Sequence, residues 1–444
     1  MKLYIETYGC QMNESDSELV RSILYQHPPA TSIDEADVIL INTCAIRENA
    51  HRKIYGRLDT LRAMRKQRRR DQRPFVVGIL GCMAQNLKED LLEHPVVNLI
   101  VGPDNYKSLP HLIEQVASEG KPVIEAHLSE YETYDDIAPA RIKGVNAWVT
   151  VMRGCDNFCT FCVVPYTRGR ERCRHAENIV AEIEGLVEAG YPQVTLLGQN
   201  VNSYRDGETT FADLILKAAN VEGIKRVRFT SPHPKDFPIP LIEAIAKHPH
   251  ICKHIHLPLQ SGSDRILQKM NRTYTRSEYL DLVERIRHLA PGVTLTTDVI
   301  VGFPSETEVD FQETFDLMQQ VVFDNAFIFK YSERVGTIAM HKFPDDVPQD
   351  IKTDRIVRLL DLQHRISLAQ NTAKIGQTLS VMIEGVDAKK TAYQFGKGDG
   401  PVTILFPLTP HLPGTVVPVT IERASQNRLY GRVPNHHREA AHEI

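Results

Sequence analysis

The sequence lacks the long apolar runs that membrane proteins need. No window of its 444 residues approaches the roughly 18 continuous apolar residues of a membrane-spanning helix. Its first residues read as a strand, not as a charged segment followed by an apolar leader. It also lacks internal repeats, low-complexity tracts and a sustained heptad pattern, so we expect a monomer. These absences predict a soluble, cytoplasmic protein with no membrane partner.

The sequence has little net charge and few cysteines. The net charge is −4, so any affinity for nucleic acid must come from local basic patches. The chain has only 8 cysteines, and it is long enough to bury several cores without disulfides. In a reducing compartment these thiols are better interpreted as metal ligands or buried thiols.

Patterns of secondary structure divide the chain into three units. Over residues 1–118, strands alternate with helical patterns, which predicts a doubly wound parallel sheet in an α/β fold. An acidic segment without periodicity, 119–145, is the expected linker. Six βα units over 146–370 predict a partial (β/α) barrel. Short β runs broken by Gly and Pro over 372–435 predict a small all-β barrel, followed by a polar tail, 436–444.

The elements behind this division are as follows. The predicted strands are 2–7, 37–42, 75–80, 97–101, 147–153, 193–197, 225–230, 254–257, 294–301, 325–331, 379–383, 402–406 and 416–421. The helical patterns are 14–25, 47–64, 86–93, 107–119, 176–189 and 279–289.

The strongest chemical signal is a run of three cysteines, Cys155, Cys159 and Cys162, just after the first strand of the second unit. Three thiolates on one loop can hold three irons of a cubane iron–sulfur cluster, which usually takes four cysteines. A cluster with three protein ligands leaves one iron open, as a catalytic metal requires. The alternative is a structural zinc site, for which Cys173 or His175 could supply the fourth ligand.

A second set of cysteines lies in the first unit. Cys10, Cys44 and Cys82 each come one or two residues after a predicted apolar strand, and each is one βα unit from the next. Neighbouring parallel strands are about 5 Å apart, so three strand ends can bring three thiolates together. The alternative is that they are buried thiols that pack as small apolar side chains.

The CxxxCxxC loop after a strand that opens a barrel resembles that of the radical S-adenosylmethionine superfamily. The resemblance implies a [4Fe–4S] cluster that passes an electron to the sulfonium of the cofactor, giving methionine and a 5′-deoxyadenosyl radical. It also implies that Phe161, beside the last cysteine, lies against the adenine of the cofactor.

Later strand ends carry further polar groups that would face the mouth of the barrel. Ordinary loop chemistry explains any one of them, but together they favour a cofactor pocket and match conserved blocks of the superfamily. The candidate cofactor-binding residues, besides Phe161, are Gln199, Asn200, Ser231, Gln260, Asp298 and Val301.

Two three-cysteine sites followed by a β barrel resemble the methylthiotransferase family over essentially the whole chain. The matching motifs are Thr7-Tyr8-Gly9-Cys10-Gln11-Met12-Asn13, Ile41-Asn42-Thr43-Cys44, Gly81-Cys82-Met83-Ala84-Gln85 and the run from Cys162 to Glu171. That last run is most similar to the subgroup that acts on N6-dimethylallyladenosine in tRNA. Two departures are Cys173, where the subgroup usually has Ser, and Ser305, where Gly is common; neither replaces a cluster ligand.

The resemblance implies a radical transferase with two [4Fe–4S] clusters and two S-adenosylmethionine molecules per turnover. One cofactor methylates a sulfur held at the first-domain cluster. The other yields the radical that removes hydrogen from C2 of the adenine, next to the anticodon at position 37, and the carbon radical takes the methylthio group. We assign no acid or base, because no side chain could remove an aromatic C–H proton. The implied partners are the tRNA anticodon stem-loop, a reductase and a sulfur donor of unknown identity.

Basic residues gather in three places that could contact RNA. The segment 62–73 carries seven basic residues against one acid, including Arg68 and Arg69, and is either a phosphate grip or a solvated helix end. Arg168, Arg170, Arg172 and Arg174 follow the cysteine loop and could face RNA or only fix the loop. The last barrel resembles the TRAM domain, which implies RNA binding through Lys389, Lys390 and Lys397, unless it only packs on the core.

Other functions remain open at this point. Sister enzymes of the family act on threonylcarbamoyladenosine in tRNA or on an aspartate of a ribosomal protein. A member of another class would be a non-catalytic RNA-binding protein stabilised by metal. Three-ligand sites argue against it, because a structural site is normally closed by a fourth ligand.

Overall fold

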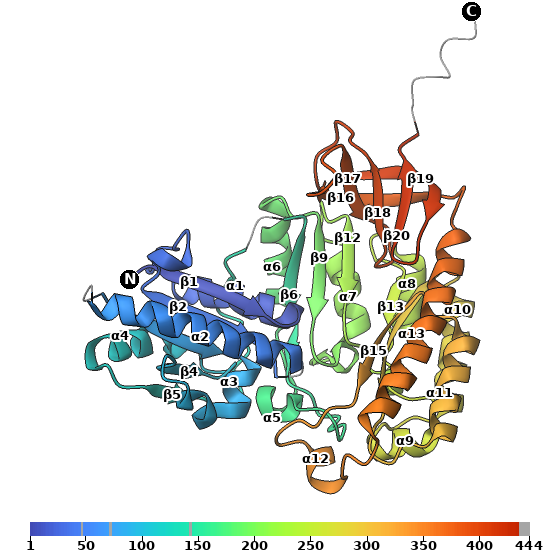
Figure 1. Cartoon of the computed structure of the whole chain (residues 1–444). Helices are drawn as coiled ribbons and strands as arrows, with labels where there is room; N and C mark the ends of the chain where they lie inside the picture. Colours follow the sequence, from blue (N-terminus) through green and yellow to red (C-terminus); the bar gives the residue numbers. More distant parts are fainter. Residues whose placement is uncertain (46–47, 71–72, 142–143, 435–444) are drawn as a thin grey trace, which may run out of the picture.

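The computed structural model describes residues 1–45, 48–70, 73–141 and 144–434. The N-terminal sheet lies beside the first strands of the central unit, and the small β barrel caps one end of that unit (Figure 1). Among the described helices, none is long and apolar enough to cross a membrane. The polar tail expected over 436–444 lies outside the described residues.

The N-terminal unit is a parallel sheet, as expected, with five strands where the sequence predicted four. Its strands follow chain order across the sheet: β1 (Leu3–Tyr8), β2 (Val38–Thr43), β3 (Val76–Leu80), β4 (Leu99–Val101) and β5 (Val123–Glu125). Alternate strand residues pack against α1 (Gln11–Ile23) and α4 (Leu109–Glu119) on one face, and against α2 (Glu48–Arg70) and α3 (Cys82–Leu87) on the other. Both faces of the sheet are therefore covered, which is why β2 and β3 are continuous apolar runs.

Two details of this unit differ from the expectation. Strand β5 lies inside the segment 119–145 that was expected to be a linker, and it pairs with β4 at the edge of the sheet. The helical pattern 86–93 is the end of α3 followed by a 3-10 turn, Lys88–Glu93, because Lys88 has a positive φ of 38° that ends the α-helix. The remaining short turns are Ile33–Glu35 and Tyr106–Ser108.

The central unit is an open barrel of six parallel strands. Three of them, β6 (Asn146–Thr150), β9 (Gln193–Leu197) and β12 (Arg226–Phe229), form one sheet, and β13 (His254–His256), β14 (Thr294–Val301) and β15 (Asn325–Lys330) form the other. A bridge between Val227 and Ile251 joins the two sheets. The predicted partial barrel is confirmed.

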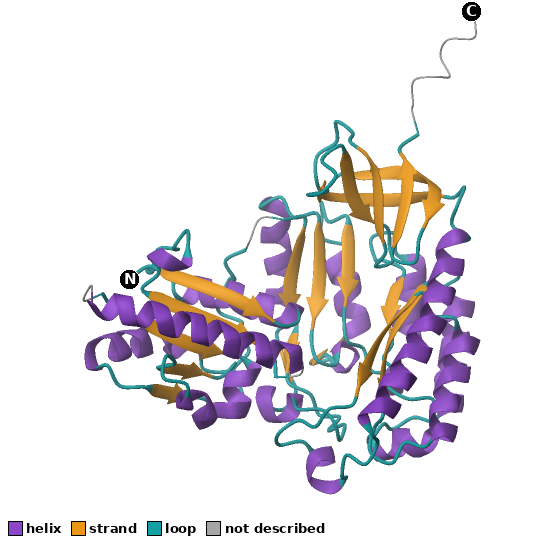
Figure 2. Ribbon diagram, in the orientation of Figure 1, coloured by secondary structure: helices purple, strands orange, loops and turns teal. Residues whose placement is uncertain are grey.

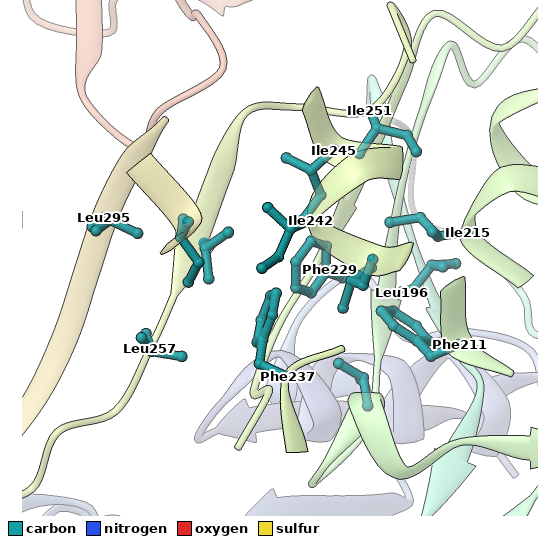
Figure 3. Close-up of a cluster of buried hydrophobic side chains, with 14 of the residues drawn as sticks. Leu196, Phe211, Ile215, Phe229, Phe237, Ile242, Ile245, Ile251, Leu257 and Leu295 are labelled. Atoms are coloured by element: carbon teal, nitrogen blue, oxygen red, sulfur yellow. The ribbon is translucent and has the colours of Figure 1, made fainter. Parts of the chain in front are cut away.

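Helices cover the outside of this barrel. They are α6 (Ala176–Glu188), α7 (Phe211–Ala219), α8 (Ile239–Lys247), α10 (Arg276–Leu289), α11 (Glu308–Val321) and α13 (Gln349–Thr372). Two short helices, α9 (Asp264–Lys269) and α12 (Ile338–Lys342), lie at the end of the unit opposite the small β barrel (Figure 1). Figure 3 shows the core between them, where Leu196 and Phe229 of the strands lie among Ile215 of α7 and Ile242 of α8. Burial of each such side chain contributes about 1.5–3 kcal/mol.

The predicted strand 147–153 is divided in two. At Val151 the backbone leaves β9: its N–H donates to Leu197 O (2.9 Å), but its carbonyl accepts from Arg174 N (3.0 Å). The chain continues as β7 (Met152–Arg153), which pairs antiparallel with β8 (Arg172–Cys173). This pair closes a loop that holds the three cysteines and α5 (Val164–Arg168). A second short hairpin joins β10 (Arg205–Asp206) and β11 (Thr209–Thr210).

The C-terminal unit is the expected closed β barrel. Its strands are β16 (Thr378–Val386), β17 (Tyr393–Lys397), β18 (Thr403–Pro407), β19 (Val416–Ala424) and β20 (Arg428–Arg432). Arg226, at the start of β12, donates to Lys397 O (2.6 Å) and Ser380 O (2.7 Å). The small barrel thus covers the amino ends of the central strands, whereas the cysteine loop lies beyond their carboxyl ends, at the arrowheads in Figure 2.

Candidate active site

The cysteines of the first unit come together at one edge of its sheet. Cys10 caps the start of α1 after β1, Cys44 follows β2, and Cys82 opens α3 after β3. These three strands are neighbours in the sheet. Cys10 and Cys44 are hydrogen-bonded. A Cβ on Gly9 would lie 2.2 Å from Asn13 Oδ1 and 3.0 Å from Cys44 Cβ, so a side chain at position 9 would displace Asn13.

Charge around these thiols favours ligand formation. The hydrogen bond from Cys44 lowers the pKa of Cys10 to about 6 against the effect of burial, and the positive charge of Arg168 adds to the shift. Burial raises the pKa of Cys82, whose Sγ accepts a hydrogen bond from Arg168 Nε at 3.1 Å. Metal ligands must be thiolates, so a positive guanidinium beside the sulfur favours binding.

The second set of cysteines lies on the loop between β7 and α5. Cys155 N donates to Gly169 O (3.2 Å), and Cys162 N donates to Cys159 O (2.9 Å), so the loop is folded on itself. Gly154 has φ +81°, and a Cβ there would lie 1.9 Å from Arg170 O, so only glycine fits at the start of the loop.

Burial dominates the thiol chemistry of this loop. It raises the pKa of Cys155 to about 11 and that of Cys162 to about 12, and the neighbouring Cys159 adds to both shifts. Arg272 Nη1 donates to Cys159 Sγ at 3.3 Å. Each set of cysteines therefore has one buried arginine that donates to one of its sulfurs.

The two sets fit clusters better than single ions. Among the residues that the structure describes, no three His, Cys, Asp or Glu side chains are arranged to hold one metal ion. A cubane binds each thiolate at a different iron, so its ligands stand farther apart than the ligands of one zinc. The zinc alternative also loses its fourth ligands: Cys173 Sγ accepts from Arg205 N (3.4 Å), and His175 pairs with Asp206 (3.1 Å).

The two cysteine sites adjoin each other. Val163, directly after Cys162, packs with Cys82 and Ala45 in one buried cluster, and α3 packs against α5. The carboxyl edge of the first sheet thus meets the mouth of the barrel. Nothing in the spacing of either set of cysteines predicts this meeting.

The polar residues expected at the mouth follow the strand ends. Gln199 Oε1 accepts from Gly154 N (2.6 Å), which ties the loop after β9 to the cysteine loop. Asn200 Nδ2 donates to Glu171 (3.3 Å), while its buried Oδ1 has no hydrogen-bond partner among the described residues. Ser231 and Gln260 hold positive φ values of 61° and 67°. Unsatisfied polar atoms and strained backbone of this kind are typical of ligand sites.

The remaining three cofactor candidates line the other side. Phe161 packs beside the buried Phe303 and Tyr331, and within the described part of the chain the hydroxyl of Tyr331 also lacks a partner. Asp298 faces His256 with 3.3 Å between carboxylate and imidazole. Val301 is buried and offers only its carbonyl, which accepts from Tyr331 N (2.8 Å).

The structure corrects two of the RNA-contact predictions. Arg168 is only 3% exposed because it binds Asp16 and Cys82, and Arg68 is 5% exposed because it binds Asp34 O and Asp37. Neither can reach a phosphate at the surface. Arg172 and Arg174 are also buried and fix the loop.

Other RNA candidates are accessible. Arg170 is exposed and stacks 5.1 Å from the ring centroid of Phe158. Lys389 and Lys390 are exposed on the small barrel, where Lys390 lies near the rings of Tyr393 and Tyr430. The side chain of Arg69 lies outside the described residues.

Two residues at the site escaped the sequence analysis. Asp16 is an ordinary acid in an amphipathic helix by its pattern, yet it is fully buried and accepts from Arg153 and Arg168. Arg272 lies far from the cysteine motif in sequence. A charged residue at an apolar position of α1 is the only signal that could have pointed to Asp16.

Comparison with known proteins places the chain. Residues 149–318 match the radical SAM superfamily, and residues 2–102 match a family described as "Uncharacterized protein family UPF0004". A tRNA-2-methylthio-N(6)-dimethylallyladenosine synthase from Phocaeicola vulgatus is 47% identical over 438 residues, covering 97% of this chain and 95% of that protein. The same enzyme from Porphyromonas gingivalis is 46% identical over 440 residues, covering 97% and 95%.

The chain belongs to this synthase family. In this chain the radical SAM match, 149–318, lies between the N-terminal sheet and the C-terminal β barrel. Among solved structures, the radical SAM methyltransferase TsrM from Kitasatospora setae shares the fold, with a TM-score of 0.56, 13% identity and 77% of each chain covered. That structure contains cobalamin and a [4Fe-4S] cluster.

Proposed function

We propose that this protein is a radical tRNA methylthiotransferase that adds a methylthio group to C2 of N6-dimethylallyladenosine, beside the anticodon at position 37. The observation that carries the proposal is the contact between two three-cysteine sites, made where Val163 packs on Cys82. A transferase that joins a sulfur to a carbon radical needs both sites near one substrate. The synthases that match this chain over 97% of its length support the substrate.

Three cysteines at each site would hold a [4Fe–4S] cluster and leave one iron open. With S-adenosylmethionine, these groups supply the electron, the radical, the methyl group and the place where sulfur is held. The protein contributes the ligands Cys155, Cys159 and Cys162 at one site and Cys10, Cys44 and Cys82 at the other.

The other residues of the mouth position the cofactor and exclude water. Asn200 and Tyr331 each offer a buried polar atom that lacks a partner among the described residues, and Ser231 and Gln260 hold the loops after β12 and β13 in a positive-φ conformation. Phe161, Gln199, Asp298 and Val301 complete the proposed cofactor site. No side chain is assigned as acid or base, because the C2–H bond of adenine is broken by a radical.

Exposed cationic groups hold the tRNA. Arg170 lies at the cysteine loop and is placed to contact nucleotides near the target base. Lys389 and Lys390, on the small barrel at the opposite end, contact a second region of the tRNA. An unstacked base of the anticodon loop enters the mouth at small energetic cost. Such a reaction belongs in the cytoplasm and draws on a reductase and a sulfur donor.

The proposal is tested under anaerobic conditions. Protein reconstituted with iron and sulfide receives S-adenosylmethionine, dithionite and tRNA that bears N6-dimethylallyladenosine, and digested tRNA is examined by mass spectrometry. We expect the methylthio nucleoside, and its loss in both Cys159→Ala and Cys44→Ala.

Two other results would change the proposal. Formation of 5′-deoxyadenosine with an unchanged nucleoside would keep the radical chemistry and move the substrate to that of a sister enzyme. Absence of both products from protein with full clusters would refute the enzyme.

A further inference from the structure

Buried charge joins the two cysteine sites. Asp16 on α1 accepts hydrogen bonds from Arg153 (2.8 Å) and from Arg168 (2.7 Å), and all three side chains are at most 3% exposed. Arg168 ends α5 on the loop that carries Cys155, Cys159 and Cys162. Its Nε donates across the domain boundary to Cys82 Sγ at 3.1 Å. The guanidinium of Arg168, on a loop of the second unit, therefore bonds both the Asp16 carboxylate and the Cys82 sulfur of the first unit.

The charges in this cluster do not balance. Arg172, also buried, forms a bidentate pair with Asp104 (2.9 Å for both bonds) and donates to Arg168 O (3.0 Å). Three buried arginines thus face two buried carboxylates, Asp16 and Asp104. Among the described atoms, Arg168 Nη1 and Arg153 Nη1 have no hydrogen-bond partner. An uncompensated buried charge costs several kcal/mol, so this cluster is suited to a further anion.

The sulfur of Cys82 lies in reach of Arg168, and it would be an anion as a cluster ligand. Thiolates of an iron–sulfur site carry negative charge, and hydrogen bonds to their sulfurs are among the factors that set the reduction potential of a cluster. A second group of interface charges, Arg141 and Arg174 with Glu18, Glu182 and Asp135, contacts no cysteine in the described residues.

We propose that Arg168 is a positioning residue that couples the two sites: from the radical-site loop, it holds the Cys82 ligand and supplies the positive charge that the first-domain cluster requires. This inference rests on the proposed function, since it takes Cys82 as a cluster ligand. Loss of the N–H to sulfur bond and of the charge disfavours the reduced, more negative cluster. Loss of the Asp16 carboxylate has the opposite electrostatic effect.

The test measures the first-domain cluster alone. In a full-length chain with Cys155, Cys159 and Cys162 all changed to Ala, a redox titration followed by electron paramagnetic resonance reports the potential of the remaining cluster. Arg168→Gln is expected to shift that potential to more negative values, and Asp16→Asn to more positive values. Opposite shifts distinguish this role from simple loss of structure.

In the chain that keeps all six proposed ligand cysteines, Arg168→Gln is expected to lower the amount of methylthio product per 5′-deoxyadenosine formed. The loss should be about 10- to 100-fold, as for other residues that support metal ligands. Arg168→Lys keeps the charge beside Asp16 but cannot span both partners, so its shift in potential should be smaller and of the same sign. This variant decides the matter if Arg168→Gln does not fold.

Arg141→Gln is the matched control, because Arg141 is an interface arginine with a side chain only 9% exposed that bonds Glu18 (2.7 Å) but, among the described residues, no cysteine. It should lower stability and leave the potential unchanged. Equal potentials in the Arg168 and Arg141 variants would overturn the inference while the proposed function stands. Failure of the three-alanine chain to bind any cluster would instead refute the proposed function and the inference with it.

Discussion

The two cysteine sites of this molecule are built in different ways. Cys155, Cys159 and Cys162 lie on one loop, closed by β7 and β8, so their convergence depends on local structure. Cys10, Cys44 and Cys82 come from three loops, and they meet only because β1, β2 and β3 are neighbours in one sheet. The first site can form once its loop is closed, whereas the second requires the whole N-terminal sheet.

This difference predicts how each site responds to damage. We call the set Cys10, Cys44 and Cys82 the dispersed site, and the set Cys155, Cys159 and Cys162 the loop site. A change that weakens the N-terminal sheet should remove the dispersed site while the loop site still forms. In both sites a buried arginine donates a hydrogen bond to a cysteine sulfur. Arg168 donates to Cys82, and Arg272 donates to Cys159.

The largest effect should come from removing one complete set of ligands. With Cys10, Cys44 and Cys82 changed to Ala, iron should fall from about eight to about four per chain, since each cluster holds four irons. Methylthio product should vanish while 5′-deoxyadenosine still forms. With the loop set changed to Ala, both products should vanish although about four irons remain. Iron analysis and nucleoside chromatography check this, and retained product in either variant contradicts the two-site assignment.

The second largest effect should be on the boundary between the units. Arg172→Gln leaves Asp104, with its side chain 1% exposed, without its bidentate partner, and should lower the free energy of unfolding by about 3–5 kcal/mol. Urea unfolding of the iron-free protein measures it. Arg205→Gln, an exposed change on β10, is the control and should alter stability by no more than about 0.5 kcal/mol. Similar values for both variants would show that the boundary pair is not structural.

The sequence predicted local features of this molecule but not the burial of Arg68 and Arg168. Most strand ends were predicted, because apolar runs and the residues that follow them are local patterns. The role of the six cysteines at these strand ends as cluster ligands stays a prediction. Arg68 and Arg168 were misread as surface cations. Their burial depends on Asp37 and Asp16, which lie 31 or more residues away in the chain and are brought near only by the fold.

Short edge elements were missed for a related reason. Strand β5 has three residues, all half-buried, and shows neither an apolar run nor an alternation long enough to detect. The β7–β8 pair depends on a backbone bond between Val151 and Arg174 that no composition reveals. The contact between the two cysteine sites is likewise a property of tertiary packing, not of either motif.

The third prediction tests whether Arg272 supports the Cys159 ligand of the loop site as Arg168 is proposed to support Cys82. Arg272, held by Pro258 O (3.1 Å) and 8% exposed, donates to Cys159. Arg272→Gln should lower 5′-deoxyadenosine formation about 10- to 100-fold with the cluster retained. Anaerobic rate measurement beside cluster absorbance checks this. A full loss of the cluster would indicate that Arg272 is needed for assembly, unlike Arg168.

The fourth prediction is a pH effect beside the loop site. His233, 6% exposed, contacts the ring of Tyr274, and burial, with the charge of Arg272, lowers its pKa to about 2. Its pKa in the unfolded chain is about 6.5, so unfolding takes up a proton below that pH. The contribution of His233 to the free energy of unfolding is therefore fully present above about pH 6.5. As the pH falls below that value, this contribution decreases by up to about 1.4 kcal/mol per pH unit.

Chemical unfolding between about pH 7.5 and 5 measures this dependence. His233→Asn should flatten the decline relative to the unchanged protein. Parallel curves for this variant would show that His233 is not the group that resists protonation.

The smallest effect should come from Ser305, which has a positive φ of 67° in the loop after β14. Ser305→Gly relieves backbone strain that costs on the order of 1 kcal/mol for a residue with a side chain. It also removes a hydroxyl that accepts from Arg265 Nη1 (3.2 Å) and from Lys269 Nζ, contacts worth a similar amount at an exposed position. The change in unfolding free energy should therefore stay within about 0.5 kcal/mol. Ser305→Ala separates the two contributions, because it keeps the strain and loses only the hydroxyl; it should be less stable than Ser305→Gly, and the reverse order would mean that this loop stores no strain.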